Sequence, residues 1–280
     1  MLFRSKKHDI SVLAPDINES FDNFTLVPAS SIRFGLAAIK NVGHNVVKTI
    51  VDERNNNGEY KSITDFLIRL SPKPGESSIL NKKSLESLIR AGAFDKLAQR
   101  KELLVEVENL LEFSHESQKI KNNGQSSLFG EEQPITNKLN FSKVDLNEKR
   151  KLSPEEIQWE KDLLGMYVSD HPLNSHQHLL NNNGIIPIKE IKKDKINKII
   201  KTAGVITKIT KFITKSGKPM LFVGIEDISG KTEILVFANT LERNPVIWQE
   251  GKIIVIKGRV SDKDDQLKLL CDEAEEIISE

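Results

Sequence analysis

The sequence predicts a multidomain protein whose first part is helical and whose last part is all-β. Three observations carry this prediction. Apolar residues recur at helical spacing from residue 32 to about residue 112. A polar stretch without periodicity follows, from residue 113 to about residue 152, and is typical of a partly flexible linker. From residue 198 apolar and polar residues alternate, which indicates strands.

Composition limits the classes of function. The chain has 280 residues, with 41 basic and 40 acidic side chains and a net charge of +1, so any contact with nucleic acid must come from local patches. Cys271 is the only cysteine, which excludes an intrachain disulfide and a zinc site built on several cysteines. No apolar run reaches membrane-spanning length, and no signal-peptide core is visible. We therefore expect a cytoplasmic protein without a membrane partner.

Helix ends can be placed in the first part. Apolar residues at helical spacing follow Gly43 and stop at Asn57-Gly58. The side chains of Ser62 and Asn81 are expected N-caps, and Gly92 is an expected C-terminal stop. Residues 1–31 show no sign of a self-contained fold.

The last part predicts a five-stranded barrel. Five alternating segments follow residue 198, with a helix expected from Thr240 to Gln249 between the third and the fourth. This order is that of an OB-fold. A capping box at Ser153-Pro154 begins one further helix upstream. The predicted divisions are 1–31, the helical domain 32–112, the linker 113–152, a helical connector 153–197 and the OB-fold 198–280.

One turn interrupts the first helical segment, at Asn41-Val42-Gly43. In a helix-hairpin-helix, such a turn exposes backbone N–H groups that bind a DNA phosphate without reading sequence. Asn41 stands where glycine is usual and tolerates left-handed geometry. A β-branched residue at position 43 is expected to weaken binding by distorting the turn. The alternative is a plain turn between helices. The candidate DNA-binding residues are Lys40, Asn41, Val42, Gly43, His44, Asn45 and Lys48.

The OB-like part carries a second candidate surface, for single-stranded nucleic acid. Lysines follow the first strand and its turn, and two phenylalanines there have rings that can stack on bases. Against this, the last hairpin carries acids at 262, 264 and 265, and the phenylalanines are equally consistent with barrel core. The candidates are Lys208, Lys211, Phe212, Lys215, Lys218 and Phe222.

No metal or catalytic site is expected. His171, His176 and His178 have neither cysteines nor arranged carboxylates beside them. Nucleotidyl transfer by two metal ions needs carboxylates clustered on a rigid sheet, and no segment supplies them.

Four motifs occur in one order: GLAAIKNVG, NKKSLESLIRAGAFD, EKDLLGMYVSDHPL and the OB-like AGVITKITKFITKSGKPMLFVGIEDISG. Together they resemble the C-terminal portion of the alpha subunit of bacterial replicative DNA polymerase III, over essentially the whole chain. The resemblance implies that the hairpins hold duplex DNA and that the OB-fold lies near the single-stranded template. Leu88 to Asp95 resembles the second hairpin element, and residues 1–31 a remnant of the preceding fingers region.

The same resemblance gives the linker a function. Gln125-Ser126-Ser127-Leu128-Phe129 resembles the peptide by which these subunits bind the beta sliding clamp, with a glutamine at the pocket rim and two apolar side chains inside. The alternative is local packing of Leu128 and Phe129.

The expected function is therefore DNA and clamp binding in support of processive replication, together with other holoenzyme subunits. In this family the palm, with its magnesium, lies upstream of anything in this sequence, and the usual tau-binding segment after the OB-fold is not seen. We expect no cofactor in this chain and no polymerase activity from it alone, as for a gene fragment, a split gene or an engineered piece. The alternatives are an independent DNA-binding adapter, a decayed gene product, and an RNA-directed OB module. A NAD-dependent ligase is excluded because the Lys-x-Asp-Gly motif is missing.

Overall fold

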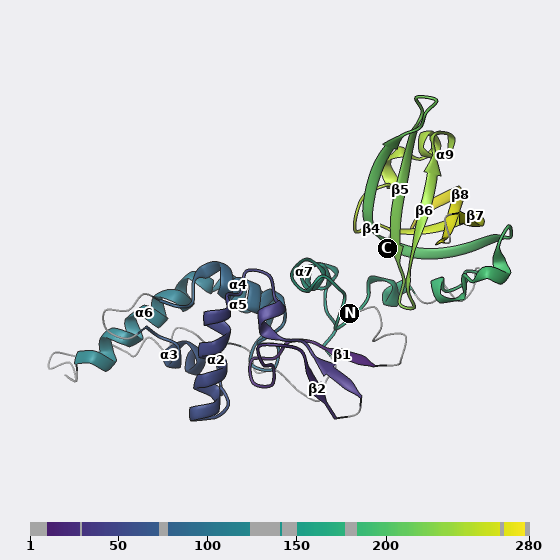
Figure 1. Cartoon of the computed structure of the whole chain (residues 1–280). Helices are drawn as coiled ribbons and strands as arrows, with labels where there is room; N and C mark the ends of the chain where they lie inside the picture. Colours follow the sequence, from purple (N-terminus) through teal and green to yellow (C-terminus); the bar gives the residue numbers. More distant parts are fainter. Residues whose placement is uncertain are drawn as a thin grey trace. The chain divides into compact units, whose positions relative to one another are not determined.

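The chain forms two compact units, Met1–Ser169 and Asp170–Glu280, in a computed structural model (Figure 1). The structure describes residues 10–28, 30–72, 78–123, 141, 150–176, 184–263 and 266–277. A helical unit with a small sheet precedes a closed five-stranded barrel, so the predicted fold class is confirmed. No helix in these ranges has the length and the apolar character needed to cross a bilayer.

The first unit is built from short strands and seven helical elements of the described chain. Its strands are β1 (Ser11–Leu13), β2 (Thr25–Val27) and β3 (Ser31–Arg33). Its helices are η1 (Leu36–Ala38), α2 (His44–Asn57), α3 (Ile63–Arg69), α4 (Lys82–Arg90), α5 (Arg100–Val105), α6 (Val107–Asn123) and α7 (Pro154–Leu164).

The helix ends lie where local chemistry places them. The Ser62 side chain accepts a hydrogen bond from the Asp65 N–H at 3.0 Å, and Asn81 and Ser153 each cap a helix through a capping box. At the other ends, Gly58 and Gly165 have positive φ values of 81° and 77°, which end α2 and α7. These capping predictions are confirmed.

The described residues before position 32 pack with the helices, so the predicted division after residue 31 does not separate two units. Strand β3 pairs with β1 in parallel and with β2 antiparallel, and it crosses the expected boundary at residue 31. Ile17 and Phe34 lie in the same hydrophobic core as the helices. Strands of three residues are too short to show periodicity, so the sequence pattern missed them.

Three further expectations need correction. A single 3-10 turn, η1, precedes the Asn41 turn in place of an α-helix, because the preceding residues belong to β3. At the other side of the unit, α6 continues to Asn123, although the change in composition after Phe113 predicted a linker. The connector predicted at 153–197 is divided, since α7 belongs to the first unit and residues from Asp170 belong to the second.

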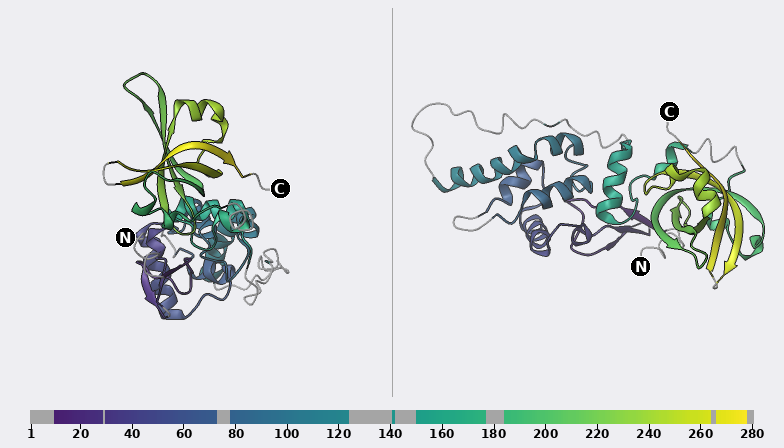
Figure 2. Two further views of the ribbon diagram at one scale, coloured as in Figure 1. Left: turned by 90° about the vertical axis from the view of Figure 1, so that its right-hand side faces the viewer. Right: turned by 90° about the horizontal axis from the view of Figure 1, so that it is seen from above.

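The second unit is a closed barrel with the strand order β4-β5-β6-β8-β7. Its strands are β4 (Ile199–Ile213), β5 (Pro219–Glu226), β6 (Lys231–Phe237), β7 (Ile253–Lys263) and β8 (Gln266–Glu276), seen from two further sides in Figure 2. All pairs are antiparallel except β6 with β8, which closes the barrel. The other elements are η3 (Pro172–His176), η4 (Ile188–Glu190), η5 (Lys193–Lys195), α9 (Ala238–Arg243) and η6 (Pro245–Ile247).

The helix expected at 240–249 is earlier and shorter. It begins directly after β6, at Ala238, and Asn244-Pro245 stops it because proline cannot continue the hydrogen-bond ladder. Ile247 and Trp248, at its expected end, instead pack into the barrel core.

Candidate nucleic-acid interfaces

The first candidate surface is the turn between η1 and α2. Val42 is buried and anchors this turn in the core, whereas the other predicted side chains are exposed. The structure therefore brings the predicted residues to one surface as a group; the exposed ones are Lys40, Asn41, Gly43, His44, Asn45 and Lys48.

Asn41 adopts the left-handed conformation that the sequence predicted, with φ of 68°. Its side-chain amide donates to Ser87 Oγ in α4 at 3.2 Å, and the neighbouring Lys40 N–H donates to the Leu163 carbonyl of α7 at 3.1 Å. The turn is thus held by hydrogen bonds to two other helices of the same unit.

The backbone conformation of Gly43 corrects the expectation for a β-branched residue at this position. Its φ of −74° and ψ of 150° are ordinary extended values, and a Cβ built at this position meets nothing within 4 Å. A valine here fits without distorting the turn, so the expected mechanism of weakened binding is wrong. Any effect of such a substitution on DNA binding must come from the bulk of the new side chain at the surface.

The start of α2 combines favourable and unfavourable groups for an anion. The first N–H groups of a helix have no acceptor within it, and they carry partial positive charge. Gly43, the N-cap residue, offers no side-chain oxygen to them. The carboxylate of Asp22 lies close by, with its Oδ1 3.0 Å from His44 Nδ1. A phosphate at this position is therefore attracted by the two lysines and by the start of α2, and it is repelled by the carboxylate of Asp22.

Asn41 provides a test of the turn itself. Asn41→Val is expected to lower the free energy of unfolding by about 1–2 kcal/mol, because a β-branched residue is strained at positive φ. Asn41→Gly is the matched control, since glycine adopts this conformation freely and loses only the bond to Ser87. Urea denaturation of both variants measures the difference. Equal stability of the two would show that the turn is not left-handed in solution.

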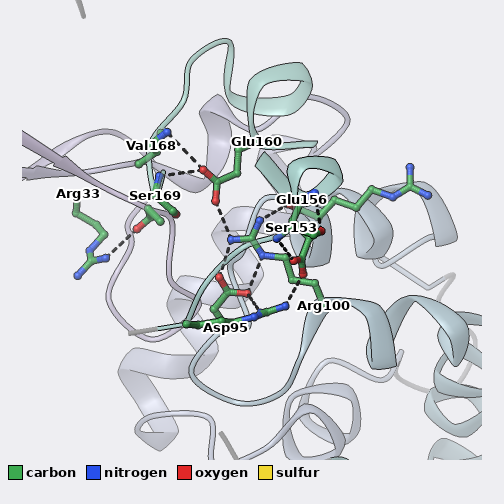
Figure 3. A network of polar contacts seen from close by, with 11 residues as sticks. Arg33, Asp95, Arg100, Ser153, Glu156, Glu160, Val168 and Ser169 are labelled. Carbon is green, nitrogen blue, oxygen red and sulfur yellow. Dashed lines mark hydrogen bonds and ion pairs between the residues drawn. The ribbon is translucent and has the colours of Figure 1, made fainter. Parts of the chain in front are cut away.

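The side chain of Arg100 packs against the second hairpin element, Leu88 to Asp95, and binds Asp95 (Figure 3). Gly92 has φ of 87°, and a Cβ on it would lie 2.3 Å from Arg100 Nη2. Arg100 donates to both carboxylate oxygens of Asp95, at 2.8 and 2.6 Å, and to the Arg90 carbonyl at 3.1 Å. This element is therefore stabilised from inside, and sequence reasoning identified its glycine but not this arginine.

Arg100 also binds a carboxylate from α7. Its Nη2 lies 2.7 Å from Glu160 Oε1, and the two side chains are 1% and 0% exposed. The other oxygen of Glu160 accepts the N–H groups of Val168 and Ser169, at 3.4 and 2.9 Å. Arg150 extends the network by pairing with Asp95 and Glu156. Burial alone would lower the pKa of Arg100, but Asp95 and Glu160 outweigh it and raise that pKa above its usual value.

The second candidate surface is the outer face of the barrel at β4 and β5. The register pairs Lys208 with Gly224, Thr210 with Phe222 and Phe212 with Met220, so these residues share one face. Phe212 is 52% exposed, and its ring lies 6.1 Å from that of Phe222, edge to face. Phe212 therefore does not belong to the barrel core, which was the alternative that the sequence left open.

The remaining predicted lysines are distributed differently. Lys211 pairs with Leu221, whose side chain packs into the core, so Lys211 points away from the face that carries Phe212. Lys215 and Lys218 lie exposed in the β4–β5 turn. Lys268 of β8 was missed: its Nζ lies 5.6 Å from the Phe222 ring and 2.6 Å from Glu233 Oε2. Nothing in the local sequence indicates that β8 reaches this face.

Comparison with known proteins gives a match for each of the two units. Residues 9–104 match a family described as helix-hairpin-helix motif, and residues 200–277 match the OB-fold nucleic acid binding domain. DNA polymerase III subunit alpha of Borreliella burgdorferi is 36% identical over 278 residues, which cover 98% of this chain and 23% of the relative. The corresponding protein of Aquifex aeolicus is 34% identical over 256 residues, or 91% of this chain and 20% of the relative.

Nearly the whole chain is similar to a segment of DNA polymerase III subunit alpha. It spans less than a quarter of the length of these curated relatives. Among solved structures, asparaginyl-tRNA synthetase from Pyrococcus horikoshii resembles 34% of the chain at 16% identity with a TM-score of 0.29, which is too low to support a conclusion.

Several of the predicted residues lie outside the part of the chain that the structure describes. Gln125, Ser126, Ser127, Leu128 and Phe129 lie outside the described residues, as do Asp264 and Asp265. Within the part of the chain that is described, no group of three or more histidine, cysteine or acidic side chains is arranged to hold a metal ion.

Proposed function

We propose that this chain is a DNA-binding C-terminal part of a polymerase III alpha subunit that supports processive replication. The observation that carries the proposal is the exposed turn at Asn41, which presents a helix start and two lysines on a scaffold held by α4 and α7. The homology to DNA polymerase III subunit alpha supports a role in replication.

The hairpin surface fits the backbone of duplex DNA. Its donors are backbone N–H groups and lysines, which bind phosphates but do not distinguish bases. We therefore propose binding that is independent of sequence and sensitive to salt. The outer face at Phe212 and Phe222 fits single-stranded template, because aromatic rings stack on any base.

We also propose two protein contacts. The segment Gln125 to Phe129 binds the beta sliding clamp, which the resemblance of its five residues to a clamp-binding peptide supports. Other subunits of the polymerase III holoenzyme are the further partners, as the homology suggests.

Two lysines, one near the start of α2 and one beyond its end, test the duplex contact. Lys48→Gln is expected to weaken duplex binding up to about fivefold at low salt. It should also reduce the slope of log affinity against log salt by about one, because one phosphate contact is lost. Lys61→Gln is the matched control: Lys61 is also exposed but follows the far end of α2, and a 14-residue helix is about 21 Å long.

Fluorescence anisotropy with two duplexes of unrelated sequence measures both variants. The result that supports the proposal is a loss for Lys48→Gln alone, equal on both duplexes. Identical salt slopes for the parent protein and Lys48→Gln would contradict the hairpin as a DNA contact.

A further inference from the structure

Charge is strongly segregated within the second unit. Residues 189–218 contain ten lysines and only two acids, whereas the rest of the unit contains seven basic and fourteen acidic residues. The excess of lysines extends well upstream of the outer face at Phe212. It begins with Lys189, before β4, and includes Lys192, Lys193 and Lys198.

The lysines of the upstream segment lack the partners that other lysines have. Four lysines elsewhere in the barrel are paired with glutamates: Lys231 with Glu226, Lys252 with Glu276, Lys257 with Glu273 and Lys268 with Glu233. In the described part of the unit, Lys192, Lys193 and Lys198 are exposed and form no ion pair, and only Lys195 approaches an acid, Asp194, at 3.6 Å. Their charge is therefore available to a ligand.

The segment is firmly attached to the barrel. Asp227 accepts the Ile188 N–H at 2.7 Å, and Ser229 accepts the Lys189 N–H at 3.0 Å. Ile188 and Ile191 are buried in the barrel core. Asn197 donates to the Val260 carbonyl at 2.9 Å, and the Val260 N–H donates to the Lys198 carbonyl at 3.0 Å. The lysines thus stand on an ordered surface.

Strand pairing adds an arginine and an apolar side chain to this surface. Ile199 pairs directly with Arg259 of β7, so both side chains lie on one face. Ile199 is 56% exposed, and Arg259 is exposed without an ion pair among the described residues. We call Lys192, Lys193, Lys198 and Arg259 the upstream basic surface. The segment itself carries two acids, Glu190 and Asp194, and of the acids of β8 Glu273 is neutralised by Lys257.

A bulge in β4 changes which side chains of the strand face away from the barrel core, although Ala203 and Val205, which face away from it before the bulge, are buried. Ile206 pairs with Ile225 and Lys208 with Gly224, so Thr207 is an extra residue in the strand. Before the bulge, even-numbered residues such as Ile206 face the barrel core. After the bulge, odd-numbered residues such as Ile209 face it. Outward side chains are therefore odd-numbered before Thr207 and even-numbered after it. Ile199 and Lys208 both face outward as a result.

We propose that the upstream basic surface binds the phosphodiester backbone of nucleic acid, as a contact additional to the outer face at Phe212. Unpaired cations on an ordered surface gain affinity for a polyanion by releasing its counterions. The surface carries no aromatic ring, so it binds without regard to base. The proposal adds a second contact surface to the barrel. It rests on the proposed function in one point, that the ligand of the barrel is a nucleic acid.

Neutralising three lysines tests the proposal in the full chain. The variant Lys192→Gln/Lys193→Gln/Lys198→Gln is expected to bind a single-stranded oligonucleotide about tenfold less tightly at low salt. Its salt slope should be flatter by about two, since each single-strand phosphate contact contributes about 0.7. The control, Arg243→Gln/Lys252→Gln, removes basic charge elsewhere in the unit, leaves the pair of Lys257 with Glu273 intact and should bind like the parent.

Three probes separate the possible ligands: the single strand, a duplex of equal length, and polyglutamate. A selective loss on the single strand, the duplex or both supports the proposal and identifies the strand form bound. Equal losses for the variant and its control, or a loss on polyglutamate as large as on nucleic acid, would overturn it. Phe212→Ala and Lys48→Gln, measured in parallel, report on the proposed function independently, because neither residue belongs to this surface.

Discussion

Arg100→Met is expected to lower the free energy of unfolding of the first unit by about 3–5 kcal/mol. The substitution leaves the carboxylate of Glu160 fully buried without its cation, and it removes the donors to Asp95 and to the Arg90 carbonyl. An uncompensated buried charge costs more than the ion pair contributes. The double variant Arg100→Met/Glu160→Gln should recover part of the loss, because a neutral amide is easier to bury.

The chain contains a matched control for this prediction. Lys82 and Glu108 approach to 2.6 Å, almost the distance between Arg100 and Glu160, but both are exposed. Lys82→Met should leave the stability unchanged within error, because solvent screens this pair. Comparing the two substitutions isolates the effect of burial from that of distance.

Each unit contains one of the two tryptophans, which allows the measurement to be assigned. Trp159 lies in α7 and Trp248 in the barrel. In a Trp248→Phe background, urea denaturation followed by fluorescence reports on the first unit alone. If Arg100→Met shifts the midpoint no more than Lys82→Met does, the network does not stabilise the helices.

Leu128→Ala/Phe129→Ala is expected to abolish binding to the beta sliding clamp while leaving thermal stability and duplex DNA binding unchanged. Burying the two side chains in a clamp pocket would contribute about 3–6 kcal/mol. Ordering the peptide offsets part of this, so the parent should bind with roughly micromolar affinity. Ile135→Ala/Leu139→Ala removes two apolar side chains from the same polar stretch and is the matched control.

Surface plasmon resonance on immobilised clamp, with both variants and a short peptide containing Gln125 to Phe129, measures the contact. The peptide should bind alone and compete with the full chain. A double variant that melts several degrees lower and still binds the clamp would show that Leu128 and Phe129 are core residues, and the partner would then be wrong.

Local chemistry determined what the sequence could predict. Caps such as Ser62, Asn81 and Ser153 act over three residues, and the left-handed turn at Asn41 depends on a single residue type, so both were predictable. The pairing of Arg100 with Glu160 joins residues sixty positions apart, and Lys268 reaches Phe222 only because β8 closes the barrel. No local pattern records such contacts. Gly43 was misjudged because a glycine in sequence does not reveal its φ.

The two N–H bonds that Glu160 accepts have a consequence for how the first unit ends. Helix α7 ends at Leu164, but the bonds to Val168 and Ser169 hold the chain for five more residues, to the last residue of the first unit. One oxygen of this buried carboxylate binds Arg100, and the other holds the backbone at the boundary of the unit. Loss of Glu160 would therefore release the end of the unit together with the arginine, so a single side chain links the stability of the helices to the order of the chain that leaves them.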